Sequence, residues 1–191
     1  MNDRRTDTER ARQEHWLTRY YFMRAAFSAV WVGLAFSIGQ ISPAAVAALL
    51  VVYPAWDALA NYIDMSRAGG MAEGRIQAIN VVISILTTIA VIVALRVDMS
   101  WVLGVFGDWA ILSGLLQLGT AARRWKHFGA QWAMILSGAQ SALAGAFFIV
   151  QARAAMPPVI ARVAAYAAVG AIYFLVSALW LSVSRMRRKA L

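Results

Sequence analysis

The chain has 191 residues, of which 61% are hydrophobic and only 14% are charged, whereas soluble globular domains carry about 25% charged residues. It contains no cysteine, which excludes disulfides, thiolate catalysis and cysteine-based metal sites. The formal net charge of +9 raises nucleic-acid binding as a function, but the placement of the basic residues along the chain argues against it.

Six long apolar runs follow one another along the chain. Each is close to the length of about 20 residues that an α-helix needs to cross roughly 30 Å of hydrocarbon. The sequence therefore predicts an all-α polytopic membrane protein with six transmembrane helices. The runs cover residues 20–39, 43–63, 76–95, 100–120, 129–151 and 159–183.

Residues 1–19, before the first run, are predicted to be a cytoplasmic basic arm. Thr6 followed by Glu9 is typical of a capping box and predicts a short helix at the membrane surface. This helix either docks a partner protein or simply leads into the first span. Because no A-x-A cleavage site precedes the span, we expect an uncleaved signal anchor.

Basic residues gather on one side of the predicted membrane. All of the 18 Lys and Arg except Arg96, Arg153 and Arg162 fall in the arm, near the start of the first run (Arg24), in the loops after the second and fourth runs, or in the tail 185–191. The positive-inside rule then places both termini in the cytoplasm. The predicted partners are the lipid bilayer and anionic lipid at its cytoplasmic face, and no nucleic acid.

Within the transmembrane domain 20–184, three helical hairpins are predicted at 20–66, 74–124 and 127–184. The three copies of the hairpin begin with similar stretches, which are RAAFSAVWVG from Arg24, QAINVVISIL from Gln77 and QWAMILSGAQ from Gln131. Each hairpin enters and leaves on the same side, so the repeats are parallel. Inverted repeats would instead indicate alternating access.

The second run carries the most polar face of any span. Tyr53, Asp57, Asn61 and Asp64 are spaced by three and four, which places them on one helix face. An acidic residue at the centre of a span costs about 2.5–3.5 kcal/mol on insertion scales. We therefore expect that these carboxylates are not incidental and that they serve a site or hold helices together. Arg24 lies between the depths of Asp57 and Asp64 and is predicted to pair with one of them. Such a pair either serves a proton or ligand site or merely holds the first hairpin together.

Two further polar groups extend this prediction. Asp108 lies off the main polar face of its helix and is proposed as a second acidic station, so that Asp57 and Asp108, at different depths, would form a proton relay. At the inner ends of the spans a polar cluster is expected to form either a vestibule for a small ligand or lipid headgroup, or a network of satisfied amides. Its members are Gln77, Asn80, Gln117 and Gln131.

Small residues on the fifth run predict close helix packing. Ser137, Ser141 and Gly145 are spaced by four, as are Gly138, Ala142 and Ala146, and such spacing lets helix backbones approach each other. The same patterns allow a homo-oligomer without requiring one. Ser and Thr elsewhere on the polar faces are expected to act as interhelical hydrogen-bond partners.

Signatures of catalysis are missing from the sequence. His15 and His127 are the only histidines, and neither has a second ligand at helical spacing, so no metal site and no cofactor are predicted. The sequence contains no H-E-x-x-H motif and no P-loop. We therefore expect a protein that is not an enzyme.

Three features of the chain carry a resemblance to a known family. They are the stretch RAAFSAVWVGLAF from Arg24, the stretch WAILSGLLQLGTAARRW from Trp109, and the Gly-rich apolar hairpins over 20–185. With these features the chain resembles the HdeD-like acid-resistance membrane protein family. The resemblance implies a bacterial inner-membrane protein linked to acid or general stress, and brings no catalytic residues. Pro43 stands near the family's usual proline, whereas Asp57, Asn61 and Asp64 are extra polarity in the second span.

The sequence therefore predicts an HdeD-like membrane protein with a role in stress tolerance and an uncharacterised molecular activity. One alternative is a small channel or proton-coupled transporter that uses the intramembrane carboxylates. The other is a structural or partner-binding protein whose polar faces hold the helices together. A hydrated cavity that reaches both Asp57 and Asp108 would favour the transporter, and a dry, fully paired interior would favour the structural protein.

Overall fold

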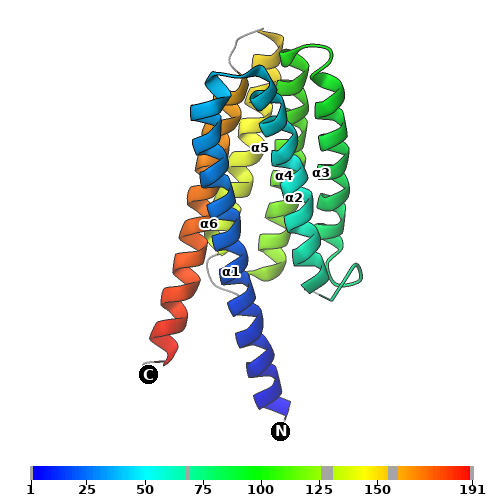
Figure 1. Ribbon diagram of the computed structural model, residues 1–191. Helices are drawn as coiled ribbons and strands as arrows, with labels where there is room; N and C mark the ends of the chain where they lie inside the picture. Colours follow the sequence, from blue (N-terminus) through cyan, green and yellow to red (C-terminus); the bar gives the residue numbers. More distant parts are fainter. Residues whose placement is uncertain (1, 68, 126–130, 155–158, 190–191) are drawn as a thin grey trace.

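The computed structural model describes residues 2–67, 69–125, 131–154 and 159–189, and these are helical apart from short connections. The helices lie side by side in one elongated bundle (Figure 1). The prediction of an all-α fold is confirmed for these residues. The elements are α1 (Asn2–Ser37), the 3-10 turn η1 (Ile38–Gln40), α2 (Pro43–Arg67), α3 (Arg75–Ala94), α4 (Met99–Arg124), α5 (Gln131–Arg153) and α6 (Val159–Lys189).

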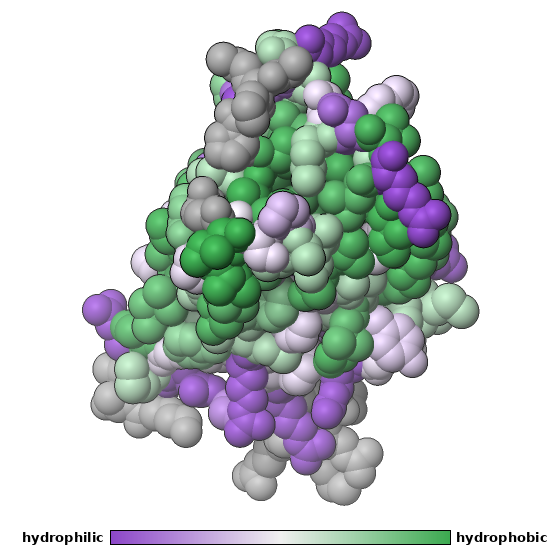
Figure 2. Space-filling model, turned by 45° about the horizontal axis from the view of Figure 1, so that its top comes forward, coloured by the Kyte–Doolittle hydropathy of each residue, from purple (hydrophilic) through white to green (hydrophobic). Residues whose placement is uncertain are grey.

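Five of these helices, α2 to α6, are long and apolar enough to cross a membrane. Their outward faces carry exposed apolar side chains such as Ile79, Leu143 and Ile172. Figure 2 shows apolar surface over much of the molecule and hydrophilic residues gathered toward its ends. Because such a surface is unfavourable in water and favourable in hydrocarbon, the chain is a multi-pass helical membrane protein.

The two ends of the bundle differ in charge. The start of α1, the end of α6 and the α2–α3 turn lie at one end, which we call the basic end because Arg67, Arg75 and Arg124 lie there (Figure 1). The α1–α2 and α3–α4 turns lie at the opposite end. Lys126 and His127, and with them the predicted start of the third hairpin, lie outside the described residues.

Helix α1 is a single helix of 36 residues. The short surface helix predicted within the arm 1–19 is the first part of this helix, because neither glycine nor proline interrupts the chain before Gly33. The side chains of Thr6 and Glu9 lie outside the described part of the structure. At the basic end α1 and α6 extend beyond the other helices and diverge toward the two termini (Figure 1), and an ion pair joins Glu14 to Arg188.

Helix packing is most extensive between different predicted hairpins rather than within one hairpin. The pairs with the largest contacts are α4 with α5, α1 with α6, and α2 with α3. By contrast, α1 touches α2 only lightly, and α5 touches α6 less than it touches α4. Since α6 returns to pack on α1, the helices close into a ring around a common interior.

Helices α4 and α5 approach through glycines. A Cβ added at Gly107, Gly114, Gly138 or Gly145 would lie less than 3.0 Å from the carbonyl oxygen of the facing glycine. Of the small residues predicted to pack, Gly138 and Gly145 face α4, whereas Ala146 is exposed. Backbones that approach this closely gain dispersion contacts, which are a main source of helix association in lipid.

The interior has two parts along the bundle axis. Away from the basic end it is filled by an apolar core, in which Leu50, Phe106 and Val163 are fully buried. Nearer the basic end, polar side chains occupy the interior, and a second apolar cluster that includes Leu17, Tyr21 and Leu181 flanks them. The described helices therefore enclose a polar region that is sealed at one end by packed apolar side chains.

Candidate binding site in the bundle interior

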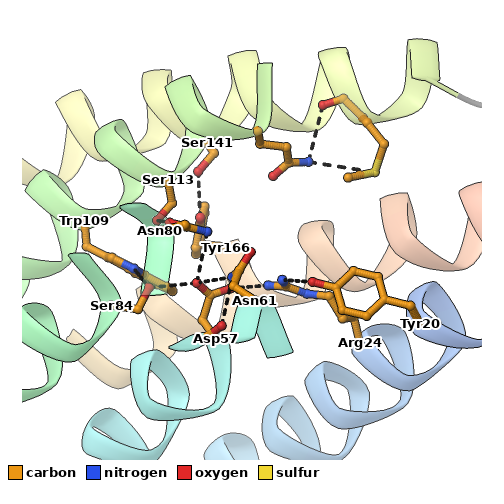
Figure 3. A network of polar contacts seen from close by, with 12 residues as sticks. Tyr20, Arg24, Asp57, Asn61, Asn80, Ser84, Trp109, Ser113, Ser141 and Tyr166 are labelled. Atoms are coloured by element: carbon orange, nitrogen blue, oxygen red, sulfur yellow. Dashed lines mark hydrogen bonds and ion pairs between the residues drawn. The ribbon is translucent and has the colours of Figure 1, made fainter. Parts of the chain in front are cut away.

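Asp57 is the centre of a hydrogen-bond network between helices (Figure 3). Its Oδ1 forms an ion pair with the guanidinium of Arg24 on α1. Its Oδ2 accepts hydrogen bonds from Ser84 at 2.8 Å, Asn61 at 3.0 Å and Asn80 at 3.5 Å. The carboxylate is buried, and donors from three helices satisfy it, as a buried charge requires.

The network continues onto α4. The indole Nε1 of Trp109 donates to the hydroxyl of Ser84 at 3.1 Å, and the hydroxyl of Ser113 donates to Oδ1 of Asn80 at 3.2 Å. Figure 3 shows Ser84 and Trp109 on one side of Asp57. A carboxylate on α2 is thus linked through α3 to α4, so its charge orders three helices at once.

The guanidinium of Arg24 is held on the other side of Asp57 (Figure 3). It donates to the hydroxyl of Tyr20 at 3.0 Å and lies 4.5 Å from the ring centroid of Phe174 on α6. Cation–π attraction is strongest where water is excluded. Arg24 therefore contacts an anion, a phenol and an aromatic face simultaneously, and it joins α1 to both α2 and α6.

A second carboxylate, Asp64, lies closer to the basic end than Asp57 does. Its Oδ2 accepts from Arg124 at 3.0 Å and from Gln77 at 3.3 Å, and its Oδ1 accepts from Nε1 of Trp16 at 3.4 Å. The guanidinium of Arg67 lies 5.1 Å from the centroid of the Trp16 ring. This Asp64 cluster ties α1, α3 and α4 to α2 where the bundle meets its basic end.

Between the two ion pairs lies a cavity of about 100 Å³ that side chains of all six α-helices line. A single water needs only about 10–15 Å³ by the same measure, so the cavity has room for several waters or one small solute. A second hollow of about 180 Å³ shares Ile76, Gln77, Thr120 and Arg124 with it and also contacts Gln13. The cavity thus adjoins a hollow at the basic end, whereas the apolar core closes the other end.

Most of the predicted site residues meet in this cavity. Among the described residues its lining includes Arg24, Tyr53, Asp57, Asn61, Asp64, Gln77, Asn80 and Gln117. Of the two predicted partners for Arg24, the structure selects Asp57. Gln131 is buried but is not among the residues that line the cavity.

Asp108 is a further exception, because it does not line the cavity. Its side chain is exposed on the outer face of α4, whereas the neighbouring Trp109 is buried. One residue turns an α-helix by about 100°, so a side chain next to an inward one easily points outward. Asp57 and Asp108 are therefore not brought together, and the structure supplies no basis for the relay between them.

The sequence did not predict that Arg124 and Trp16 belong to the site. Arg124 lies in the basic segment after the fourth run, and its partner Asp64 is 60 residues away in the chain. Trp16 belongs to the predicted basic arm, yet its indole binds Asp64. Helical spacing relates residues only within one helix, so no pattern in the sequence indicated either contact.

Comparisons with protein-family models, with curated proteins and with solved structures found no significant match for this chain.

Proposed function

We propose that the chain is a bacterial inner-membrane protein that binds a small polar solute in its central cavity, from the cytoplasmic side, as a transporter or sensor would. The observation that carries the proposal is the position of the cavity. It is lined by six helices and adjoins a hollow at the basic end, while packed apolar side chains close the opposite end. A polar cavity open toward one side only is what a solute-binding membrane protein needs.

The proposal includes six transmembrane spans, with the second half of α1 as the first. An unpaired arginine in that span would cost about 2.5–3.5 kcal/mol on insertion scales, but Arg24 is paired with Asp57. We propose that the internal repeat consists of three parallel helical hairpins. We place the basic end and both termini in the cytoplasm by the positive-inside rule, with anionic lipid at that face.

We propose a non-enzymatic role. The charged groups that line the cavity engage one another as ion pairs, Arg24 with Asp57 and Arg124 with Asp64, so neither carboxylate is poised to act on a substrate. An HdeD-like role in acid or general stress tolerance is part of the proposal. Its support is the resemblance in sequence, and acid-shock survival of a deletion strain with and without the gene restored tests it.

A structural or partner-binding role is the second candidate. The observation that favours it is the saturation of Asp57, which accepts from four side chains. Such a network stabilises a bundle whether or not a solute binds. The two candidates differ in one measurable property, because only a binding protein needs its cavity to be reachable from the cytoplasm.

Thiol labelling of single-cysteine variants tests access, since the natural chain has no cysteine. Ser137→Cys places a thiol in the cavity lining, and Val163→Cys places one in the fully buried apolar core. The reagent is the uncharged 2-hydroxyethyl methanethiosulfonate, with glutathione on one side of sealed vesicles to consume it there. We expect labelling of Ser137→Cys that glutathione on the cytoplasmic side prevents, and no labelling of Val163→Cys. An unreactive thiol in folded Ser137→Cys protein would favour the structural candidate.

A further inference from the structure

One wall of the cavity carries hydrogen-bonding groups that the protein leaves unused. Ser137 and Gln140 on α5 and Tyr173 on α6 line the cavity, and none of them hydrogen-bonds another of the described residues. None of their polar atoms is among the described atoms that are fully buried without a partner, so each can hydrogen-bond water or a solute that enters the cavity. Water bound to such groups can be replaced by a solute that reproduces its hydrogen bonds.

Trp56 on α2 adds an aromatic surface to this wall, because its ring lines the cavity. The ring stacks on Phe27 with centroids 4.3 Å apart and planes inclined by 15°. Stacking fixes the orientation of the indole, so this part of the lining is in place before any ligand arrives.

The cavity also has open space beside these groups. Gly170 lines it one turn from Tyr173, and a Cβ added at Gly170 would meet no atom within 4 Å. A side chain at this position would project into free volume. The glycine therefore leaves room for a guest next to α6 rather than allowing a close helix contact of the kind made at Gly138.

The charges of the cavity argue against an ionic guest. Its charged lining residues are two arginines and two aspartates, and each arginine is paired with one aspartate. The formal charge of the lining is zero. An ion would have to lose its water and displace one member of a pair, and a buried charge without a partner is costly.

We infer that the cavity takes a small uncharged molecule that both donates and accepts hydrogen bonds, of the amide or polyhydroxyl class. The Gln140 amide donates and accepts hydrogen bonds, and the hydroxyls of Ser137 and Tyr173 do either. Aromatic rings of the lining cover its apolar part. This inference names the ligand class of the site under the proposed function and rests on it.

Charge selectivity of labelling tests the inference. The Ser137→Cys protein is treated with the uncharged 2-hydroxyethyl methanethiosulfonate, its anionic sulfonatoethyl analogue and its cationic trimethylammonioethyl analogue, each rate being divided by that for a free thiol. A cost of burying charge of 1.4 kcal/mol or more corresponds to at least about a tenfold preference for the uncharged reagent. Equal relative rates for the three reagents would overturn the inference and leave the proposed function standing. No reaction with any of them would contradict both.

Two matched variants examine the assigned groups. Gly170→Leu should fill the free space and slow labelling by the uncharged reagent, whereas Gly33→Leu, an equally open glycine on the exposed face of α1, should not. Acetamide should protect the cysteine from labelling, and Gln140→Leu, which keeps a side chain of similar length and removes the amide, should weaken that protection. If Gly170→Leu does not fold, the Gln140→Leu comparison decides. Protection by acetamide that is unchanged in Gln140→Leu, or absent in the parent, would overturn the assignment.

Discussion

Gly114 and Gly138 face each other across the α4–α5 contact so closely that neither position has room for a Cβ. One added to Gly114 would lie 2.6 Å from the carbonyl oxygen of Gly138, and one added to Gly138 would lie 2.8 Å from that of Gly114. The cavity residues Ser113 and Ser137 directly precede these glycines in the chain. The glycine contact therefore sets how far apart two walls of the cavity stand.

Gly114→Ala is expected to destabilise the protein by about 1–3 kcal/mol, the usual cost of overpacking a tight contact. Gly33→Ala is the control, because nothing lies within 4 Å of its added Cβ, and replacing a helical glycine with alanine typically stabilises by about 0.5–1 kcal/mol. The measurement is unfolding in SDS–detergent mixtures. Equal stability of the two variants would contradict the close contact.

Asp57→Leu should destabilise the protein by about 3–5 kcal/mol, because it leaves the buried guanidinium of Arg24 without its counter-ion. The double variant Arg24→Met with Asp57→Leu should recover part of that loss. The same unfolding assay measures both, with Glu14→Gln as a control that breaks only the exposed pair with Arg188. Additive losses in the double variant would show that the two charges do not depend on each other.

Asp64→Asn is expected to loosen the basic end and to speed labelling of a cysteine at position 137. The reason is that Asp64 accepts hydrogen bonds from Arg124, Gln77 and Trp16 at the boundary between the cavity and the outer hollow. The labelling rate of the Ser137→Cys protein with and without Asp64→Asn is the measurement. A slower or unchanged rate would mean that this cluster does not control access.

Asp108→Leu should raise the efficiency of membrane insertion, since an acidic side chain on an exposed helix face costs up to about 2.5–3.5 kcal/mol at the bilayer centre. Its labelling behaviour in the Ser137→Cys background should stay the same, because Asp108 points away from the cavity. Insertion is read from the fraction of glycosylated product in a translocon assay. A drop in insertion would indicate that Asp108 has a partner outside this chain.

Asp98 gives the protein a predicted dependence on pH at the end opposite the basic end. Its carboxylate caps α4 by accepting from the backbone N–H of Ser100 at 2.6 Å, and hydrogen bonds from Ser100 lower the pKa of this carboxyl below its ordinary value of 3.8. Since the folded state has the lower pKa, the contribution to stability is complete above 3.8 and is lost as pH falls through the folded-state pKa. Asp98→Ala should therefore be less stable than the parent at neutral pH, and the difference should shrink on acidification.

The number of long helices and the polar face of α2 followed from the sequence alone. Apolar run length is a local property, and the membrane thickness converts it directly into a helix of known extent. The pairing of Arg24 with either Asp57 or Asp64 was also predicted, because adjacent spans joined by a short turn leave little freedom in relative depth. The helical period and the depth of each residue in the membrane thus predicted most of the residues that line the cavity.

Only the tertiary structure decided which helices became neighbours, and everything that depends on this choice lay beyond the sequence. It paired Arg124 with Asp64, turned Asp108 outward, and brought Gly114 against Gly138. In the folded bundle, apolar side chains also pack one end of the interior, whereas the other end contains the cavity. The period of 3.6 residues relates side chains along one helix, but contacts between helices are selected by packing across the whole bundle.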